Sequence, residues 1–544
     1  MPIDPRQYHS AINFIDDDKE FSRLVGNISN RDDQLRIKAY ELYADMYHNR
    51  PDHIHVTLRG EDDDSVEIYM PSAKKCIEAV NRFLAVDFDY QIDPDFGDYN
   101  AQTSVEDGLA KLFKEQDIKI KFDNLKRYLL IKGDALLHIR ALPWERPGKR
   151  IHVDELLPEN YFPIENPVTG MLLGCHIVDV IRNPRNSQRT RAESDEWIVR
   201  RQTYRLVVDE ETNLPKPDAA GSVVTSELSL WKINRWDDRV DDPDLYQIEV
   251  VQPEAGLPPF ITQIPVYHWR NSPPPNSTFG MSELAGVESL INAINQSATD
   301  EDLTLITQGL GVYWTDASPP IDDNGDEVDW EIGPGSVVQI GAGGNFGRVT
   351  GVSSVAPYHE HIRLLDENMQ QALGVPDIAI GMVDVATAES GIALQLKFGP
   401  LLAKCKEKER MIKDTTDTFL YDLVTWLIQY EGLPLTAQEC QVTSVFADPM
   451  PRNKTEELTN VLSIWTQATG VLPVSWLYEQ LNEIMGYELD EFSDFEKALQ
   501  DAKRVSETTM PPDPFGAQMD AESAPPDSSG FDASGNGQGN FNFA

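Results

Sequence analysis

The stretch 374–432 constrains the fold more than any other part of the sequence. Its second part, 391–431, carries apolar residues at three- and four-residue spacing, which is the period of one long helix. Thr387 or Ser390 can cap the start of this helix, and a glycine follows its end. Pro400 lies about two turns inside, where it removes one backbone hydrogen bond and predicts a kink. We therefore expect the chain to be organised around one long, kinked helix.

The part of this stretch before the helix shows no helical stripe and is expected to be a loop up to about Glu389. It contains Pro376, Gly381 and mostly small or aliphatic residues. Structureless loops of this length are usually functional or disordered. Within the helix, the charged run at 404–410 (KCKEKER) predicts a largely solvated turn.

Residues 1–270 predict an α+β region in which helices precede strands. Helices are expected at about 33–48, at 72–86, after a capping box at Ser104, and at 122–131, with a short strand at 53–59. From residue 134 the apolar period changes to two, and segments rich in Val, Ile, Tyr and Trp alternate with turn residues. We therefore expect 134–270 to be a mainly antiparallel sheet packed against the helices.

A helix–strand–helix arrangement is predicted after the proline-rich boundary at 269–280. A helix is predicted at 282–309, then short strands, and then a helix at 358–373 that Gly374 ends. Two such helices return the chain to the level it left, with the β insert as a tip. Residues 433–505 predict a strand and short helices, including 454–469 and 473–485, and the polar composition of 506–544 predicts a disordered tail.

Charge narrows the classes of partner. The formal net charge is −43, from 47 basic and 90 acidic residues, which argues against a surface that grips phosphates or anionic lipid. It leaves open a surface that nucleic acid slides past. Four scattered cysteines without a CxxC motif favour a reducing compartment. The N-terminus lacks the pattern of a signal peptide and no apolar run reaches membrane-span length, so we expect a soluble protein made inside the cell.

No motif predicts a catalytic or metal site. There is no Walker A sequence, and the glycines at 341–347 favour a hairpin or surface loop over a phosphate-binding loop. The GMSEL sequence at Gly280 lacks the final glycine of a nucleophile elbow. Metal binding by His53 and His55, or by His359 and His361, is a minor alternative. We therefore predict no catalytic residue, no metal and no cofactor.

Several patches resemble the portal proteins of tailed bacteriophages. They are FGMSELAGVESLINAINQSATDEDLTLI at 279–306, HEHIRLLDENMQQALGVPD at 359–377 and AESGIALQLKFGPLLAKCKEKE at 388–409. RYLLIKGDALLHI at 127–139 is similar to the helix–glycine–strand step in the N-terminal domain of that family. Their order and spacing together are more specific than any single patch, and they cover about 120–430.

The resemblance implies a portal-like α+β architecture with named parts. These are a wing at 1–270, stem helices at 271–309 and 357–374, a clip at 310–356, a tunnel loop at 375–390, a spine helix at 391–432, a mainly helical crown at 433–505 and the tail at 506–544. It also implies a ring, usually of twelve subunits, at one capsid vertex, which seeds capsid assembly and passes double-stranded DNA in and out. The family has no catalytic activity of its own.

The implied partners are other copies of the chain, double-stranded DNA, the large terminase subunit, the major capsid or scaffolding protein, and a head–tail adaptor. No membrane is involved, and the protein would lie in the virion after assembly in the host cytoplasm. The alternatives are another phage head or neck structural protein, or a carboxylate-dependent hydrolase.

The resemblance also implies site residues. In the tunnel loop the residues facing DNA would be Asp377, Ile380, Gly381, Met382, Val383, Asp384, Val385, Thr387 and Glu389. The start of the long helix would use Ser390, Gly391, Ala393 and Leu394, with the kink at Pro400. The loop contains no Lys or Arg, which suits a channel, because each neutralised phosphate adds affinity and slows translocation.

The source of positive charge in the channel stays open in the sequence. Asp300, Glu301 and Asp302 make the first stem helix acidic, and Lys397, Lys404 or Arg363 is a candidate source of positive charge in the channel. Because the loop carries no core stripe, we also expect deletion of 379–387 to leave ring assembly intact while impairing DNA packaging or retention.

Overall fold

The computed structural model describes residues 31–51, 56–57, 67–92, 99–146, 148–166, 169–182, 197–209, 215–233, 245–275, 277–310, 312–316, 318–319, 344–349, 356–381, 391–433, 441–449, 454–467, 473–485 and 497. The chain forms two compact units, Met1–Met450 and Pro451–Ala544. The described residues mix helices and sheets, which confirms the predicted α+β class. The strand predicted at 53–59 and the tail at 506–544 lie almost wholly or wholly outside the described residues.

Within the described part of the first unit, four helices and one strand come first: α2 (Arg31–His48), α3 (Ser72–Phe83), β1 (Val86–Ile92), α4 (Tyr99–Glu115) and α5 (Ile118–Lys132). The tyrosines at positions 40, 43 and 47 are buried in α2, as their spacing predicts. The capping box predicted at Ser104 is wrong, because α4 already begins at Tyr99 and Ser104 lies inside it. A short polar pattern of this kind also fits an exposed face inside a helix.

Two antiparallel sheets follow and confirm the predicted antiparallel region. The three-stranded sheet has the order β3 (Ile151–Leu156), β2 (Asp134–Ala141), β9 (Val266–Arg270). The five-stranded sheet has the order β4 (Tyr161–Glu165), β5 (Leu172–Arg182), β6 (Trp197–Leu206), β7 (Val224–Ile233), β8 (Leu245–Gly256). The sequence did not predict β4, which contains Pro163; its place at the sheet edge is where a strand tolerates proline. The short 3-10 helix η4 (Pro158–Asn160) precedes it.

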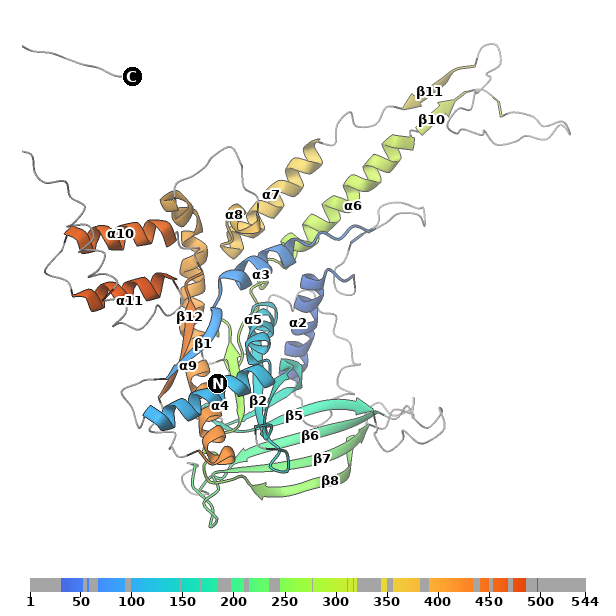
Figure 1. The fold of residues 1–544 in the computed structure, drawn as a ribbon. Coiled ribbons are helices and arrows are strands. Elements are labelled where there is room, and N and C mark those ends of the chain that lie inside the picture. Colours follow the sequence, from blue (N-terminus) through green and yellow to red (C-terminus); the bar gives the residue numbers. More distant parts are fainter. Residues whose placement is uncertain are drawn as a thin grey trace, which may run out of the picture. The chain divides into compact units, whose positions relative to one another are not determined.

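The helices α6 (Glu288–Leu310) and α7 (Ala356–Leu373) pack against one another and carry a β-hairpin at their far end (Figure 1). In this hairpin β10 (Val312–Thr315) pairs antiparallel with β11 (Phe346–Val349). The predicted start of α6 at residue 282 is six residues early. Gly286 adopts a φ of +94°, a left-handed conformation through which a right-handed helix does not continue. The short strands predicted at 327–332 and 336–340 lie outside the described residues.

The long helix α9 (Gly391–Glu431) has 41 residues and runs through Pro400, so its predicted extent is confirmed; the kink stays a prediction. The expectation of a loop without helix before it is wrong in part, because α8 (Asp377–Ile380) forms a single turn there. Pro376 precedes this turn and Gly381 ends it in the left-handed conformation. One turn is too short to produce a periodic stripe, so the sequence pattern did not reveal it.

The strand β12 (Val442–Ala447) pairs with β1, although nearly all of the first unit separates them in sequence. The predicted crown begins at residue 433, whereas the structural division into units falls after Met450. The second unit contains α10 (Lys454–Gln467) and α11 (Val474–Met485), close to the predicted helices.

The core of the first unit surrounds the second half of α9. Phe419, Leu420 and Leu423 are fully buried, and the ring of Tyr267 in β9 packs edge-on against Phe419 at 5.3 Å. The indole nitrogen of Trp269 donates a 3.0 Å hydrogen bond to the Thr416 hydroxyl. Among the described helices, none combines the length and apolar composition that crossing a bilayer requires.

Candidate functional site

The α6–α7 pair joins the rest of the first unit at a mostly buried cluster built around three charged side chains. We call Asn271, Glu283, Leu373, Lys404 and Lys408 the root cluster. Glu283 lies just before α6, Leu373 ends α7, and both lysines belong to α9. The cluster therefore connects three helices that are far apart in sequence.

Two ammonium groups meet one carboxylate in the root cluster. Lys404 and Lys408 both form ion pairs with Glu283. The Lys408 ammonium also donates a 2.6 Å hydrogen bond to the Asn271 side-chain oxygen, and the Asn271 amide nitrogen donates 2.9 Å to Glu283. The Lys404 ammonium donates 2.6 Å to the Leu373 carbonyl oxygen. The cluster borders a cavity of about 280 Å³.

Electrostatics keep Glu283 ionised in this site. Burial by itself would raise the pKa of Glu283, but the neighbouring charges of Lys408 and Lys404 outweigh it and lower the pKa to about 2. The predicted solvated turn at 404–410 is therefore wrong in part. Lys408 is only 5% exposed and Cys405 only 1%, while the rest of the turn is more accessible.

A second buried group fixes the backbone that leads into α6. Asp134 accepts hydrogen bonds from the Tyr40 hydroxyl at 2.5 Å, from the Gly280 backbone nitrogen at 2.8 Å, and from His268 at 2.7 Å. Burial would raise the pKa of Asp134, but these partners, His268 first, lower it.

Residue 280 has to be a glycine, because backbone atoms of neighbouring segments leave no space for a side chain. A Cβ there would collide with the Gly133 carbonyl oxygen and lie 2.6 Å and 2.7 Å from the Asn271 nitrogen and oxygen. The Ser282 hydroxyl donates 2.5 Å to the Ile131 carbonyl oxygen. The GMSEL sequence thus has a packing role in this structure rather than the geometry of a nucleophile elbow.

Charges along the α6–α7 pair are mostly acidic or paired. Arg363 forms ion pairs with Glu360 at 2.7 Å and Glu367 at 2.8 Å on its own helix. His359 lies 3.0 Å from Glu301 across the pair. Arg363 here and Lys404 in the root cluster, both candidate cations of the channel, are therefore bound to carboxylates.

The structure places only part of the predicted tunnel-loop site. Asp377 and Ile380 lie in α8, and Gly381 ends that helix. Ile380 is half-buried against the core, and Asp377 is exposed. Gly391, Ala393 and Leu394 lie in the first turns of α9, as expected. The remaining predicted residues, Met382, Val383, Asp384, Val385, Thr387, Glu389 and Ser390, lie outside the described residues.

The root cluster was missed although its signal was present in the sequence. Leu401, Cys405, Lys408 and Ile412 follow one another at spacings of four, three and four residues, which is a single helix face. Lys408 therefore lies on the buried stripe of α9. A charged residue on such a stripe indicates a buried partner of opposite charge.

Two observations concern metal binding and cysteine reactivity in the described residues. Among them, no three His, Cys, Asp or Glu side chains gather as a metal site would require. Burial raises the pKa of Cys76 and of Cys405 to about 12, so both are protonated thiols at pH 7 and poor nucleophiles.

Comparisons with solved structures give distant likenesses. No protein family matches the sequence, and no curated protein does. A solved chain from the virion of a native gene transfer agent particle is 12% identical, with a TM-score of 0.40, covering 82% of this chain and 92% of its own. A chain from the neck of a native gene transfer agent particle, computed with C12 symmetry, is also 12% identical with a TM-score of 0.40, covering 76% and 89%. Likeness at this level carries no conclusion about function.

Proposed function

We propose that this chain is a portal-ring subunit of a tailed phage or phage-like particle, a conduit for double-stranded DNA at one capsid vertex. The observation that carries the proposal is the α6–hairpin–α7 excursion, which returns to α8 and the 41-residue α9 (Figure 1). This order supports the stem, clip, stem and spine plan that the resemblance in sequence implies. The ring, its copy number and its virion location belong to the proposal.

The charges of the helix pair support a conduit that does not grip DNA. The sequence of α6 contains no Lys or Arg, and the single Arg of α7, Arg363, is held by two glutamates. Each chain also carries a formal charge of −43. A channel lined in this way releases few counterions from DNA, so binding is weak and translocation is not stalled.

The root cluster supports a mechanical role for the helix pair. It ties the start of α6 and the end of α7 to α9, and α9 runs through the core. A force on the far end of the pair is therefore delivered to the body of the subunit rather than to a loose hinge. Such a joint suits a part to which a packaging motor and a head–tail adaptor attach.

The alternatives differ in what they require. Another head or neck structural protein would share the acidic surface but has no need for an excursion of two helices that returns to a long central helix. A hydrolase requires a nucleophile or a metal, and the described residues gather no metal site. We therefore place the portal role first and the other structural role second.

The deciding experiment is the assembly state of the purified full-length chain. Native mass spectrometry with negative-stain imaging is expected to show rings of about twelve 61.2 kDa chains with a central hole. If the chain alone stays monomeric, the measurement is repeated after co-expression with the major capsid or scaffolding protein of its source. A chain that is monomeric in both cases, or one that hydrolyses DNA or glycosides with added divalent metal, would refute the portal proposal.

A further inference from the structure

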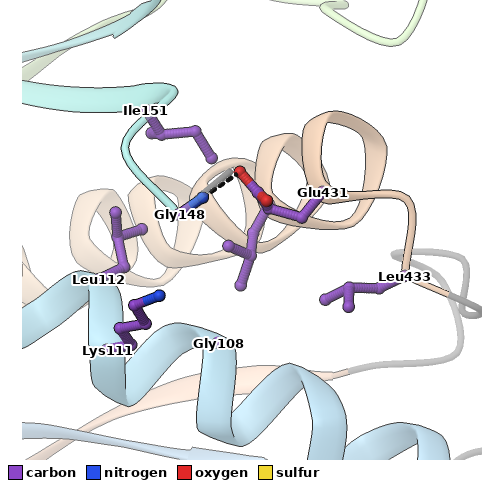
Figure 2. Close-up of a pocket in the computed structure, with 8 residues that line it drawn as sticks. Gly108, Lys111, Leu112, Gly148, Ile151, Glu431 and Leu433 are labelled. Atoms are coloured by element: carbon purple, nitrogen blue, oxygen red, sulfur yellow. Dashed lines mark hydrogen bonds between the residues drawn. The ribbon is translucent and has the colours of Figure 1, made fainter. Parts of the chain in front are cut away.

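An apolar pocket of about 260 Å³ lies where the end of α9 meets α4 and the turn between β2 and β3 (Figure 2). Its wall consists of four aliphatic and two charged side chains: Leu112, Ile151, Leu427, Leu433, Lys111 and Glu431. Drug-sized molecules occupy pockets of about 300 Å³ or more. This pocket instead suits one large apolar side chain.

The two charged side chains of the pocket differ in their surroundings. The Glu431 carboxylate accepts a 2.9 Å hydrogen bond from the Gly148 backbone nitrogen, as Figure 2 shows. The Lys111 ammonium lies beside the same turn, since a Cβ at Gly148 would be 2.8 Å from it. Among the described residues, Lys111 has neither an ion-pair nor a hydrogen-bond partner. One positive charge at the pocket is thus available to a ligand.

Hydrogen bonds hold the described residues at both ends of the turn beside the pocket. The Leu142 nitrogen donates 2.7 Å to the Arg150 carbonyl oxygen, and the Arg150 guanidinium donates 2.6 Å to the Tyr430 carbonyl oxygen at the end of α9. Gly148 has a φ of +83°, which glycine adopts without strain. A prearranged surface loses little conformational entropy on binding, so more of the contact energy appears as affinity.

The exposed face of the same turn has the composition of a protein-binding surface. Trp144 is 76% exposed, the most exposed of the large apolar side chains that the structure describes. Arg146 and Lys149 are also exposed, in a chain whose acidic residues outnumber its basic ones by 90 to 47. Trp and Arg are the residues that most often carry the binding energy of an interface.

We propose that this pocket and turn bind an acidic peptide segment of a partner protein. One large apolar side chain of the peptide enters the pocket, and carboxylates on either side of it face Lys111, Arg146 and Lys149. Charge complementarity selects an acidic occupant, because this turn is basic although the chain as a whole is acidic. The net negative charge of the chain repels an extended polyanion, so a short acidic segment is favoured. The site does not depend on the portal proposal, because none of its residues belongs to the α6–α7 pair.

The proposal is tested with the full-length protein and a synthetic peptide. Fluorescence anisotropy is measured with a fluorescein-labelled peptide of sequence DELFED, with KKLFKK of reversed charge, and with DEAAED, which lacks the apolar side chains. Only DELFED is expected to bind, with an affinity that falls as salt rises. Trp144→Ala and Lys111→Glu are each expected to weaken binding about tenfold, a loss typical of an interface residue that matters.

Matched variants separate the site from general effects. Trp314→Ala removes another exposed tryptophan, and Lys406→Glu reverses another exposed lysine, so both are expected to leave DELFED binding unchanged. Absence of DELFED binding, equal binding of KKLFKK, or unchanged affinity in both site variants overturns the proposal. Self-association that both site variants abolish in light scattering also overturns it, because the occupant is then a second copy of the chain. Ring formation is measured separately, so failure here leaves the portal proposal standing.

Discussion

The Lys404 ammonium in α9 donates a 2.6 Å hydrogen bond to the carbonyl oxygen of Leu373, the last residue of α7. The same ammonium forms an ion pair with Glu283, which precedes α6. One side chain of α9 thus contacts both the segment that leads into α6 and the last residue of α7.

Replacing Glu283 is expected to destabilise the first unit strongly. Glu283→Gln leaves the ammonium groups of Lys404 and Lys408 without their carboxylate, and Lys408 stays buried. Removing one member of a buried ion pair costs about 3 kcal/mol or more. Denaturant unfolding followed by circular dichroism measures the loss. The control is Glu407→Gln, at an exposed position of α9, the helix that contains both lysines. Equal unfolding midpoints for Glu283→Gln and Glu407→Gln would contradict the expected role of Glu283.

Acid is expected to weaken the fold through His138. Burial lowers the pKa of His138 from 6.5 to about 3, and its ring lies 2.9 Å from the Tyr204 hydroxyl. Below pH 6.5 the unfolded state binds a proton at His138 that the folded state does not. The free energy of unfolding therefore decreases as the pH is lowered from 6.5 to about 3. Between pH 6.5 and pH 4 this amounts to about 3 kcal/mol. The free energy of unfolding, measured at several pH values, should decrease less steeply towards acid in His138→Gln than in the wild type. Parallel curves for the two proteins would rule out His138 as the cause.

Gly280→Ala and Gly399→Ala are expected to differ in their cost. Backbone atoms of Gly133 and Asn271 occupy the space that a methyl group at residue 280 needs, so this variant should lose roughly 3 kcal/mol. Apart from its neighbours in the chain, nothing lies within 4 Å of a Cβ at residue 399, which is inside α9. Alanine there gains helix propensity but meets the ring of the following Pro400, so the two effects oppose and stability should change by less than about 1 kcal/mol. Thermal melting of both variants checks the contrast, which equal losses of stability would refute.

The end points chosen for deleting the predicted tunnel loop decide whether buried contacts are lost. Ala379 is 7% exposed and lies in the core, and α8 contacts α3. Deleting 379–387 therefore removes a buried contact and the glycine that ends α8. Deleting 382–387 is expected to keep the stability of the wild type and, on the portal proposal, to keep ring assembly while impairing DNA packaging or retention. Melting curves, negative-stain images and a packaging assay compare the two deletions; loss of rings in the shorter one would sink the idea.

The spacing of apolar residues predicted those helices and strands that bury one long face. The extent of α9 followed from its apolar spacing and from Gly432, because a 41-residue helix repeats its pattern many times. The end of α7 followed from Gly374, whose φ of +66° stops a helix. The antiparallel sheets followed from alternation, although β4 and β9 are too short for that signal to stand out.

Tertiary structure alone decided how distant segments meet. The pairing of β1 with β12 leaves no trace in either strand, because each hydrogen-bonds through backbone groups that every residue has. The helical spacing marked Lys408 as a residue of the buried face, but only the fold placed Glu283 and Asn271 opposite its ammonium. Sequence thus specified which faces avoid water, since that depends on residue type and local period. The partner across each face depends on long-range contacts, and those exist only once the chain has folded.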